Sequence, residues 1–186
     1  MKIFIAIKTN IDREIVCVAW TIEGRPVQII KRNSRCSEKK LLHHFFEKLV
    51  AQLGSSSATM WIGYRTRETM RILFQRAVIF NVVPPNNINS LHSFQRSKRV
   101  VDISVLWGGS IYAITLDELC QQLDIARCPL VEKYQNHFID ECSAEDLLVL
   151  AQICEDEVEC CRQLFCKLNF HSAHFSLSQF STLKKQ

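Results

Sequence analysis

The stretch KIFIAIK at residues 2–8 is apolar at nearly every position, which is typical of a strand buried on both faces of a sheet. Two further candidate strands follow at residues 14–21 and 26–30. The short Glu23-Gly24 turn between these two favours an antiparallel hairpin. We therefore expect the chain to begin with three antiparallel strands.

Helices and shorter strands alternate after this point. Ser37 is a suitable N-cap, and the apolar residues that follow it recur every three or four positions, as on one face of a helix. Thr115 and Ser143 are each followed three residues later by an acid, which is the pattern of a capping box. The expected elements are a helix at 37–53, a strand at 58–63, a helix at 68–80, a strand at 100–103, and helices at 115–123 and 143–168.

This order predicts a single α/β domain with a mixed sheet, in which three antiparallel strands precede parallel strands and helices flank the sheet. It matches the ribonuclease H-like plan. We expect the domain to span residues 1–169. Residues 170–186 show no clean periodicity and are expected to form a C-terminal tail.

The composition is that of an ordinary soluble protein, with 47% hydrophobic and 23% charged residues among 186. No apolar run approaches the roughly 18–20 residues that a membrane-spanning helix needs. The apolar run at the start is too short for a signal peptide. We therefore expect a cytoplasmic protein that does not bind membranes.

The nine cysteines include no Cys-x-x-Cys pair, and their number is odd. Both facts argue against a disulfide framework and against a zinc ribbon. Cys154 and Cys161 fall on the apolar stripe of the last predicted helix, where a free cysteine behaves as a small hydrophobic residue. We predict that the cysteines pack in the core.

Five segments, in order, carry a family resemblance. VDISVL at 101–106 resembles the motif DLMDVL, LDELC at 116–120 resembles a helix start LDELA, and ICEDEV at 153–158 resembles YCExDV. Upstream, WIGYRTRE at 61–68 stands where the family has a strand running into NGRGFD, and FIAIKT at 4–9 stands where it has FxDIET. The chain thus resembles the predicted 3′–5′ exonucleases related to the proofreading domain of family B DNA polymerases, which belong to the DEDD superfamily.

The resemblance implies a site for two divalent metal ions, which activate a water and stabilise the leaving oxygen of a phosphodiester. Magnesium and manganese prefer carboxylate oxygens for this purpose. Here the acids of the first motif are replaced by Ala6 and Lys8, and those of the second and third motifs by Glu68 and Glu157. Ile153 takes the place of a water-orienting tyrosine. With two carboxylates left of four, we expect no metal and no cofactor, unless a reduced site still works with magnesium or manganese.

Lys8 brings a positive charge to a position where the family has a metal ligand. If its side chain points into the site, we expect the ammonium group to neutralise Glu68 and Glu157, because a buried acid is costly when it is unpaired. The alternative is that Lys8 closes a sheet edge or reaches solvent. Asp102 is a weaker candidate for the site, since an aspartate at the end of a strand more often caps the following turn.

The candidate nucleic-acid contacts are basic or aromatic. Arg65 and Arg67 lie between a strand and a helix, where they could meet phosphates. Tyr64 or Trp61 could stack on a base, although Trp61 fits better in the core. The remaining members of this predicted basic rim are Arg71, Arg76, Arg96, Lys98 and Arg99.

Together these features predict a catalytically degenerate exonuclease-like domain that binds single-stranded DNA or RNA, or a protein partner in a nucleic-acid pathway. One alternative is an active metal-dependent 3′–5′ exonuclease that uses Glu68, Glu157 and Asp102. A further alternative is a structural adaptor or dimerisation subunit, with an interface on the last helix or on the phenylalanines of the tail, Phe170, Phe175 and Phe180.

Overall fold

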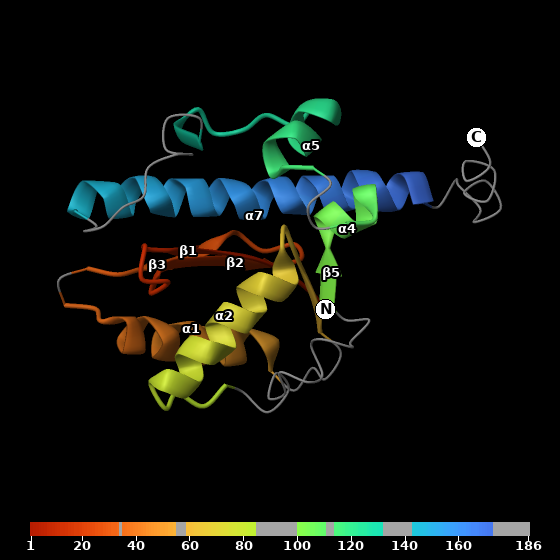
Figure 1. Ribbon diagram of the computed structural model, residues 1–186. Coiled ribbons are helices and arrows are strands. Elements are labelled where there is room, and N and C mark those ends of the chain that lie inside the picture. Colours follow the sequence, from red (N-terminus) through yellow and green to blue (C-terminus); the bar gives the residue numbers. More distant parts are fainter. Residues whose placement is uncertain (34, 55–58, 85–99, 111–113, 132–142, 173–186) are drawn as a thin grey trace.

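The computed structural model describes residues 1–33, 35–54, 59–84, 100–110, 114–131 and 143–172, and in the last of these ranges the side chains to residue 168 (Figure 1). The last helix continues to Ser172, past the end expected at residue 168, and residues 173–186 of the predicted tail lie outside the described residues. The strands are β1 (Lys2–Thr9), β2 (Ile15–Ile22), β3 (Gln28–Lys31), β4 (Met60–Gly63) and β5 (Val100–Asp102).

These five strands form one mixed sheet in the order β3-β2-β1-β4-β5. The three N-terminal strands pair antiparallel, whereas β4 lies parallel to β1 and β5 parallel to β4. The prediction of three antiparallel strands followed by parallel strands is confirmed. The apolar stretch that begins β1 lies in the middle of this sheet, which explains why Ile3, Phe4 and Ile5 are all buried.

The described helices are α1 (Glu38–Leu53), α2 (Thr66–Ile79), α4 (Ile103–Gly108), α5 (Leu116–Gln122) and α7 (Ala144–Ser172). The three predicted N-caps are confirmed. Ser37 accepts a hydrogen bond from the Lys40 amide, and Thr115 forms a capping box with Glu118. Ser143 does the same with Asp146 at the start of α7.

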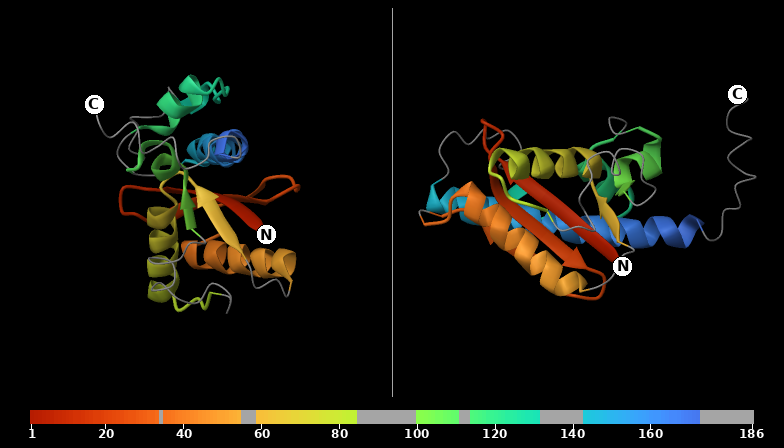
Figure 2. Two further views of the ribbon diagram at one scale, coloured as in Figure 1. Left: turned by 90° about the vertical axis from the view of Figure 1, so that its right-hand side faces the viewer. Right: turned by 90° about the horizontal axis from the view of Figure 1, so that it is seen from below.

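The helices cover the two faces of the sheet. Figure 1 shows α7 along one face, with α5 beyond it, and α1 and α2 together on the other face. Both views in Figure 2 show the same separation, with α7 on the side of the strands opposite to α1 and α2. The protein is therefore a mixed α/β structure with a helical layer on each side of the sheet. In the part of the chain that is described, none of the helices has the length and apolar character to cross a membrane.

Three local predictions were wrong. The strand predicted to reach Ile103 ends at Asp102, because the Asp102 carboxylate accepts hydrogen bonds from Ser104 and begins α4, a helix that was not predicted. Helix α2 begins at Thr66 rather than at residue 68, directly after Arg65 in the left-handed conformation, and the Thr66 hydroxyl donates to the Val101 carbonyl. Val50, one of the apolar residues after Ser37 that were expected to share one helix face, is 45% exposed on α1.

The two faces of the sheet have cores of different composition. Between the sheet and α1 and α2 the side chains are large, and the Trp20 ring meets the Phe45 ring edge-on at 5.1 Å. The α7 face has many small side chains, among them Ala6, Cys154 and Cys161. The eight described cysteines are all free. Five of them are buried as predicted, Cys154 and Cys161 among them, whereas Cys36 and Cys128 are partly exposed and Cys166 is exposed, so the prediction of core packing was wrong for these three.

Candidate functional site

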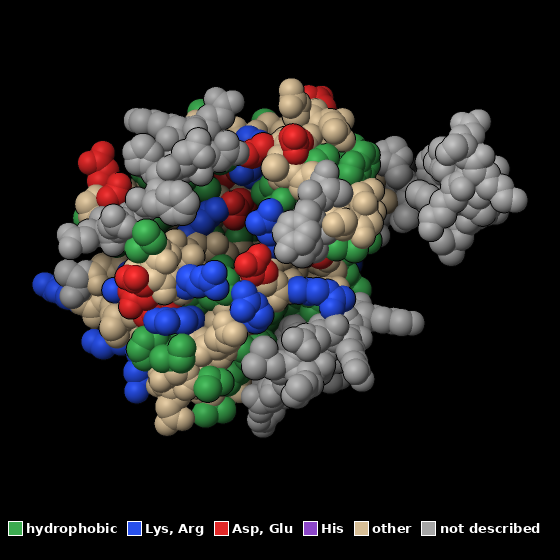
Figure 3. Space-filling model, in the orientation of Figure 1, with side chains coloured by type: hydrophobic (Ala, Val, Ile, Leu, Met, Phe, Trp, Pro, Cys, Tyr) green, Lys and Arg blue, Asp and Glu red, His purple; other side chains and the backbone are tan. Residues whose placement is uncertain are grey.

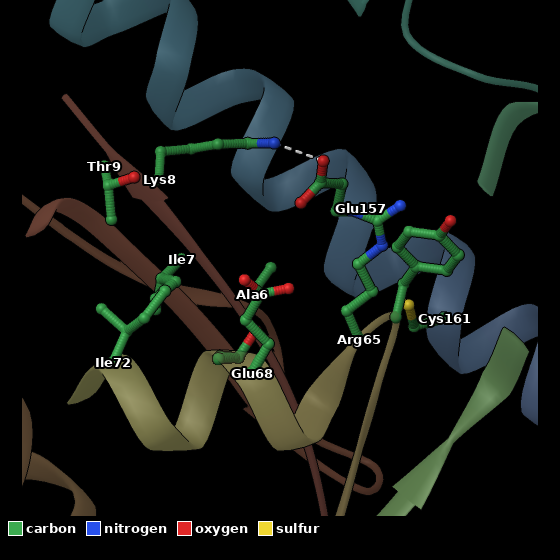
Figure 4. A pocket seen from close by; sticks show the side chains of 11 residues that line it. Ala6, Ile7, Lys8, Thr9, Arg65, Glu68, Ile72, Glu157 and Cys161 are labelled. Carbon is green, nitrogen blue, oxygen red and sulfur yellow. Dashed lines mark hydrogen bonds and ion pairs between the residues drawn. The ribbon is translucent and has the colours of Figure 1, made fainter. Parts of the chain in front are cut away.

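A pocket of about 270 Å³ opens at the carboxyl end of β1, between the first turns of α2 and the middle of α7. Figure 4 shows side chains from these three elements around it. It is lined by Ala6, Ile7, Lys8, Thr9, Tyr64, Arg65, Glu68, Thr69, Ile72, Glu157 and Cys161. The structure thus brings together four positions that the sequence singled out as degenerate site residues, namely Ala6, Lys8, Glu68 and Glu157.

Strand β1 places Ala6 and Lys8 on one side of the sheet, because side chains two residues apart in a strand share a face. Ala6 is packed in the core beneath α7. Two residues further along the same face, Lys8 extends toward α7 (Figure 4). The strand pairing becomes irregular between Lys8 and Thr9, so that Lys8 is the last residue of β1 in regular register with β2.

Lys8 and Glu157 form an ion pair across the pocket. The Lys8 Nζ donates a hydrogen bond to Glu157 Oε1, and 23% of each side chain is exposed. Burial by itself would lower the pKa of Lys8, but the charge of Glu157 and its hydrogen bond, together with the nearby Cys154, outweigh this effect and the pKa is raised. The lysine is therefore charged at neutral pH and neutralises one of the two remaining acids.

Glu68 behaves differently. Its side chain is 51% exposed, and its carboxylate lies 3.9 Å from Arg71 Nη2, one turn along the same helix. Exposed pairs of this kind contribute little to stability. The hypothesis that Lys8 neutralises both acids therefore holds for Glu157, whereas the ion pair formed by Glu68 is with Arg71.

The turn between β4 and α2 is tightly held. A Cβ atom on Gly63 would lie 2.6 Å from the Ile5 carbonyl oxygen, so this close approach of two strands requires glycine. Arg65 follows in the left-handed conformation, with φ of 52°, and its amide donates to Asp102 Oδ1 at 3.1 Å. Asp102 is buried, caps α4 and fixes this turn, and it does not line the pocket.

Tyr64 and Arg65 form part of the rim of the pocket. The Arg65 guanidinium carbon lies 5.4 Å from the centre of the Tyr64 ring, and the Tyr64 hydroxyl donates to the Ile114 carbonyl at 2.9 Å. Burial raises the pKa of Tyr64. Arg67 is exposed on the first turn of α2, and Trp61 is buried in the core, as favoured from the sequence.

Basic side chains are visible across the middle of the molecular face drawn in Figure 3, with acidic groups between them. The predicted contacts Arg96, Lys98 and Arg99 lie outside the described residues. Ile153 is 5% exposed and belongs to the buried part of α7, so it offers no polar atom to the pocket.

The residues present do not fit the metal ions that the family resemblance implies. Ala6 has no ligand atom, Lys8 brings an ammonium group, and the Glu157 carboxylate already accepts a hydrogen bond from it. Within the described ranges, no group of three or more His, Cys, Asp and Glu side chains is arranged to hold a metal ion.

Sequence reasoning missed five pocket residues, namely Ile7, Thr9, Thr69, Ile72 and Cys161. The signal that could have identified two of them is helical spacing. Arg65, Glu68, Thr69 and Ile72 recur every three or four residues, which places them on one side of α2. Comparison with known proteins adds no assignment, since no family model matches the chain and a search of curated proteins finds no significant match.

Proposed function

We propose that the chain is a catalytically degenerate 3′–5′ exonuclease-like domain with a ribonuclease H-like fold, which acts as a binding module for single-stranded nucleic acid. The observation that carries this proposal is the convergence of Ala6, Lys8, Glu68 and Glu157 on one pocket. The order of three antiparallel and two parallel strands supports the fold assignment.

The pocket lacks the parts that phosphodiester cleavage would need in this superfamily. Cleavage by two metal ions requires several carboxylates that converge without a competing positive charge. Lys8 supplies such a charge, and the acid that lies within its reach is already paired. Binding without cleavage is the activity that these side chains support.

The rim has the chemistry for a nucleic-acid strand. Arg65 and Arg67 are exposed and carry charges that phosphates attract. Tyr64 offers an aromatic ring, and bases stack on such rings with little regard to sequence. Because the charge of Lys8 is neutralised by Glu157, we expect these arginines to provide most of the attraction.

The test is fluorescence anisotropy with a labelled single-stranded oligonucleotide at increasing salt concentration. We expect micromolar or tighter binding that weakens steeply with salt. Each arginine that contacts a phosphate should reduce the salt slope by about one when it is replaced. Arg65→Asn is the suitable change at residue 65, since asparagine tolerates the left-handed backbone conformation there.

The matched control is Arg162→Gln on α7. Arg162 pairs with Glu159 and does not line the pocket. We expect this variant to bind like the wild type, whereas Arg65→Asn combined with Arg67→Gln should bind at least tenfold more weakly. Absence of binding by the wild type at low salt would contradict the proposal and favour an adaptor role.

A further inference from the structure

We infer that the Lys8 ammonium group is a built-in cation that takes the place of a divalent metal ion in this pocket and keeps such ions out. The inference deepens the proposed function and rests on it for its biological meaning, because both concern the same pocket. Its test uses a metal ion alone and needs no nucleic acid.

The geometry of the pocket carries the first step. Residues 6 and 8 lie on one side of β1, Glu157 faces them from α7, and Glu68 lies at the same pocket on α2 (Figure 4). These positions are far apart in the sequence, yet they surround one space of about 270 Å³. Oxygen ligands at these four positions would suit magnesium or manganese, which prefer carboxylates.

The second step concerns the positive charge that now lies beside the Glu157 carboxylate. The Lys8 Nζ donates to Glu157 Oε1, so the position beside this carboxylate is held by a positive charge fixed to the chain. A divalent ion bound to Glu157 would lie only a few ångströms from the ammonium group, and like charges repel strongly in a partly buried site. The ion would have to displace Lys8 into water before it could bind.

The third step separates this lysine from an ordinary surface lysine. Lys2, on the same strand, also pairs with a glutamate, but the side chains of Lys2 and Glu23 are 37% and 56% exposed. Those of Lys8 and Glu157 are 23% exposed each and line a pocket. Attraction to Glu157 raises the pKa of Lys8 in spite of its burial, so the positive charge persists throughout the physiological pH range.

The experiment is calorimetric titration of manganese into the full chain and its variants. We expect no saturable binding by the wild type. Ala6→Asp combined with Lys8→Glu removes the cation and supplies two carboxylates on the same side of β1, and it should bind manganese at least 100-fold more tightly than the wild type. Manganese should also raise the melting temperature of this double variant and leave that of the wild type unchanged, because a ligand stabilises the state that binds it.

Two controls isolate the position of the charge. Lys2→Glu makes the same lysine-to-glutamate change at a more exposed position of the same strand, and it should bind manganese no better than the wild type. Lys8→Arg keeps a cation in the pocket and should also leave manganese unbound. If the double variant fails to fold, Lys8→Met removes the ammonium group without adding acids, and it should still gain at least tenfold in manganese affinity.

Saturable manganese binding by the wild type, within tenfold of the double variant, would overturn the inference. So would folded Lys8 variants that bind manganese no better than the wild type. The outcome is independent of the proposed function. Absence of nucleic-acid binding by the wild type, with a gain of manganese binding in the variants, contradicts only the proposed function. Nucleic-acid binding by the wild type, with no gain of manganese binding in the folded Lys8 variants, contradicts only the role of Lys8.

Discussion

Two ion pairs lie on opposite faces of the sheet, and they are built differently. Glu38 at the start of α1 pairs with Arg76 near the end of α2, and their side chains are 2% and 17% exposed. Glu38 Oε1 also accepts hydrogen bonds from the Ile15 amide at 2.8 Å and from Arg76 Nε at 2.7 Å. Lys8 and Glu157, by contrast, line an open pocket and are each about a quarter exposed.

This difference separates a pair that supports the fold from a pair that a ligand can reach. The Glu38 carboxylate joins the first turn of α1 to the beginning of β2 and to the end of α2, so its loss removes a partner from the Ile15 amide and from the Arg76 guanidinium group. The Lys8–Glu157 pair joins one strand to one helix, and water can replace either partner. Stability should therefore depend on the first pair, and binding on the surroundings of the second.

The largest expected effect on stability is that of Glu38→Gln. It leaves Arg76 without its main partner in a nearly buried site, and breaking a buried pair in this way costs about 3 kcal/mol. Urea denaturation of the variant and of the wild type measures this loss in the free energy of unfolding. Glu47→Gln on the exposed side of α1 is the control and should change little. A loss below about 1 kcal/mol for Glu38→Gln would show that the two ion pairs do not differ as described.

Lys8→Met should lower the free energy of unfolding by less than Glu38→Gln does, by about 1 kcal/mol or below, because the Glu157 carboxylate that is left behind is partly hydrated. The same urea denaturation gives this value, and Lys2→Met is the matched control on β1. A loss as large as that of Glu38→Gln would mean that Lys8 is needed mainly to hold the fold.

The smallest effect is the pH dependence of the Lys8 contribution. Since the folded state raises the pKa of Lys8, the stabilisation by this residue is fully present below the unfolded lysine pKa of about 10.4 and is lost as the pH rises through the folded value. The difference in unfolding free energy between the wild type and Lys8→Met should thus stay constant from about pH 7 to about pH 10 and shrink above that. A difference that is already absent at pH 7 would contradict the assignment.

Much of the fold follows from local signals. The apolar run of β1, the spacing of α1 and the caps at Ser37, Thr115 and Ser143 predict their elements correctly, because hydrogen bonds and side-chain periodicity act over a few residues. The start of α2 was missed because its N-cap residue, Arg65, makes no side-chain capping hydrogen bond, and the Arg65 amide is held instead by Asp102, 37 positions away.

In the pocket too, some features follow from the spacing of neighbouring residues and others depend on contacts between distant parts of the chain. That Ala6 and Lys8 share a face of β1 follows from their spacing alone. The choice of Glu157 as the partner of Lys8 depends on how α7 lies across the sheet, and the sequence left open whether Lys8 pairs at all. Helical spacing could have identified Thr69, whereas Thr9 enters the pocket only through the packing of β1 and α2, for which the sequence carries no separate motif.

The most direct test of the account uses one sample for two measurements. A single-stranded oligonucleotide with a label at its 5′ end is incubated with the wild type and manganese, its anisotropy is recorded, and the same sample is then run on a denaturing gel. We predict that the strand is bound and remains at full length. Progressive shortening from the 3′ end by the wild type, abolished by Glu157→Gln, would contradict the claim that this pocket binds without cutting.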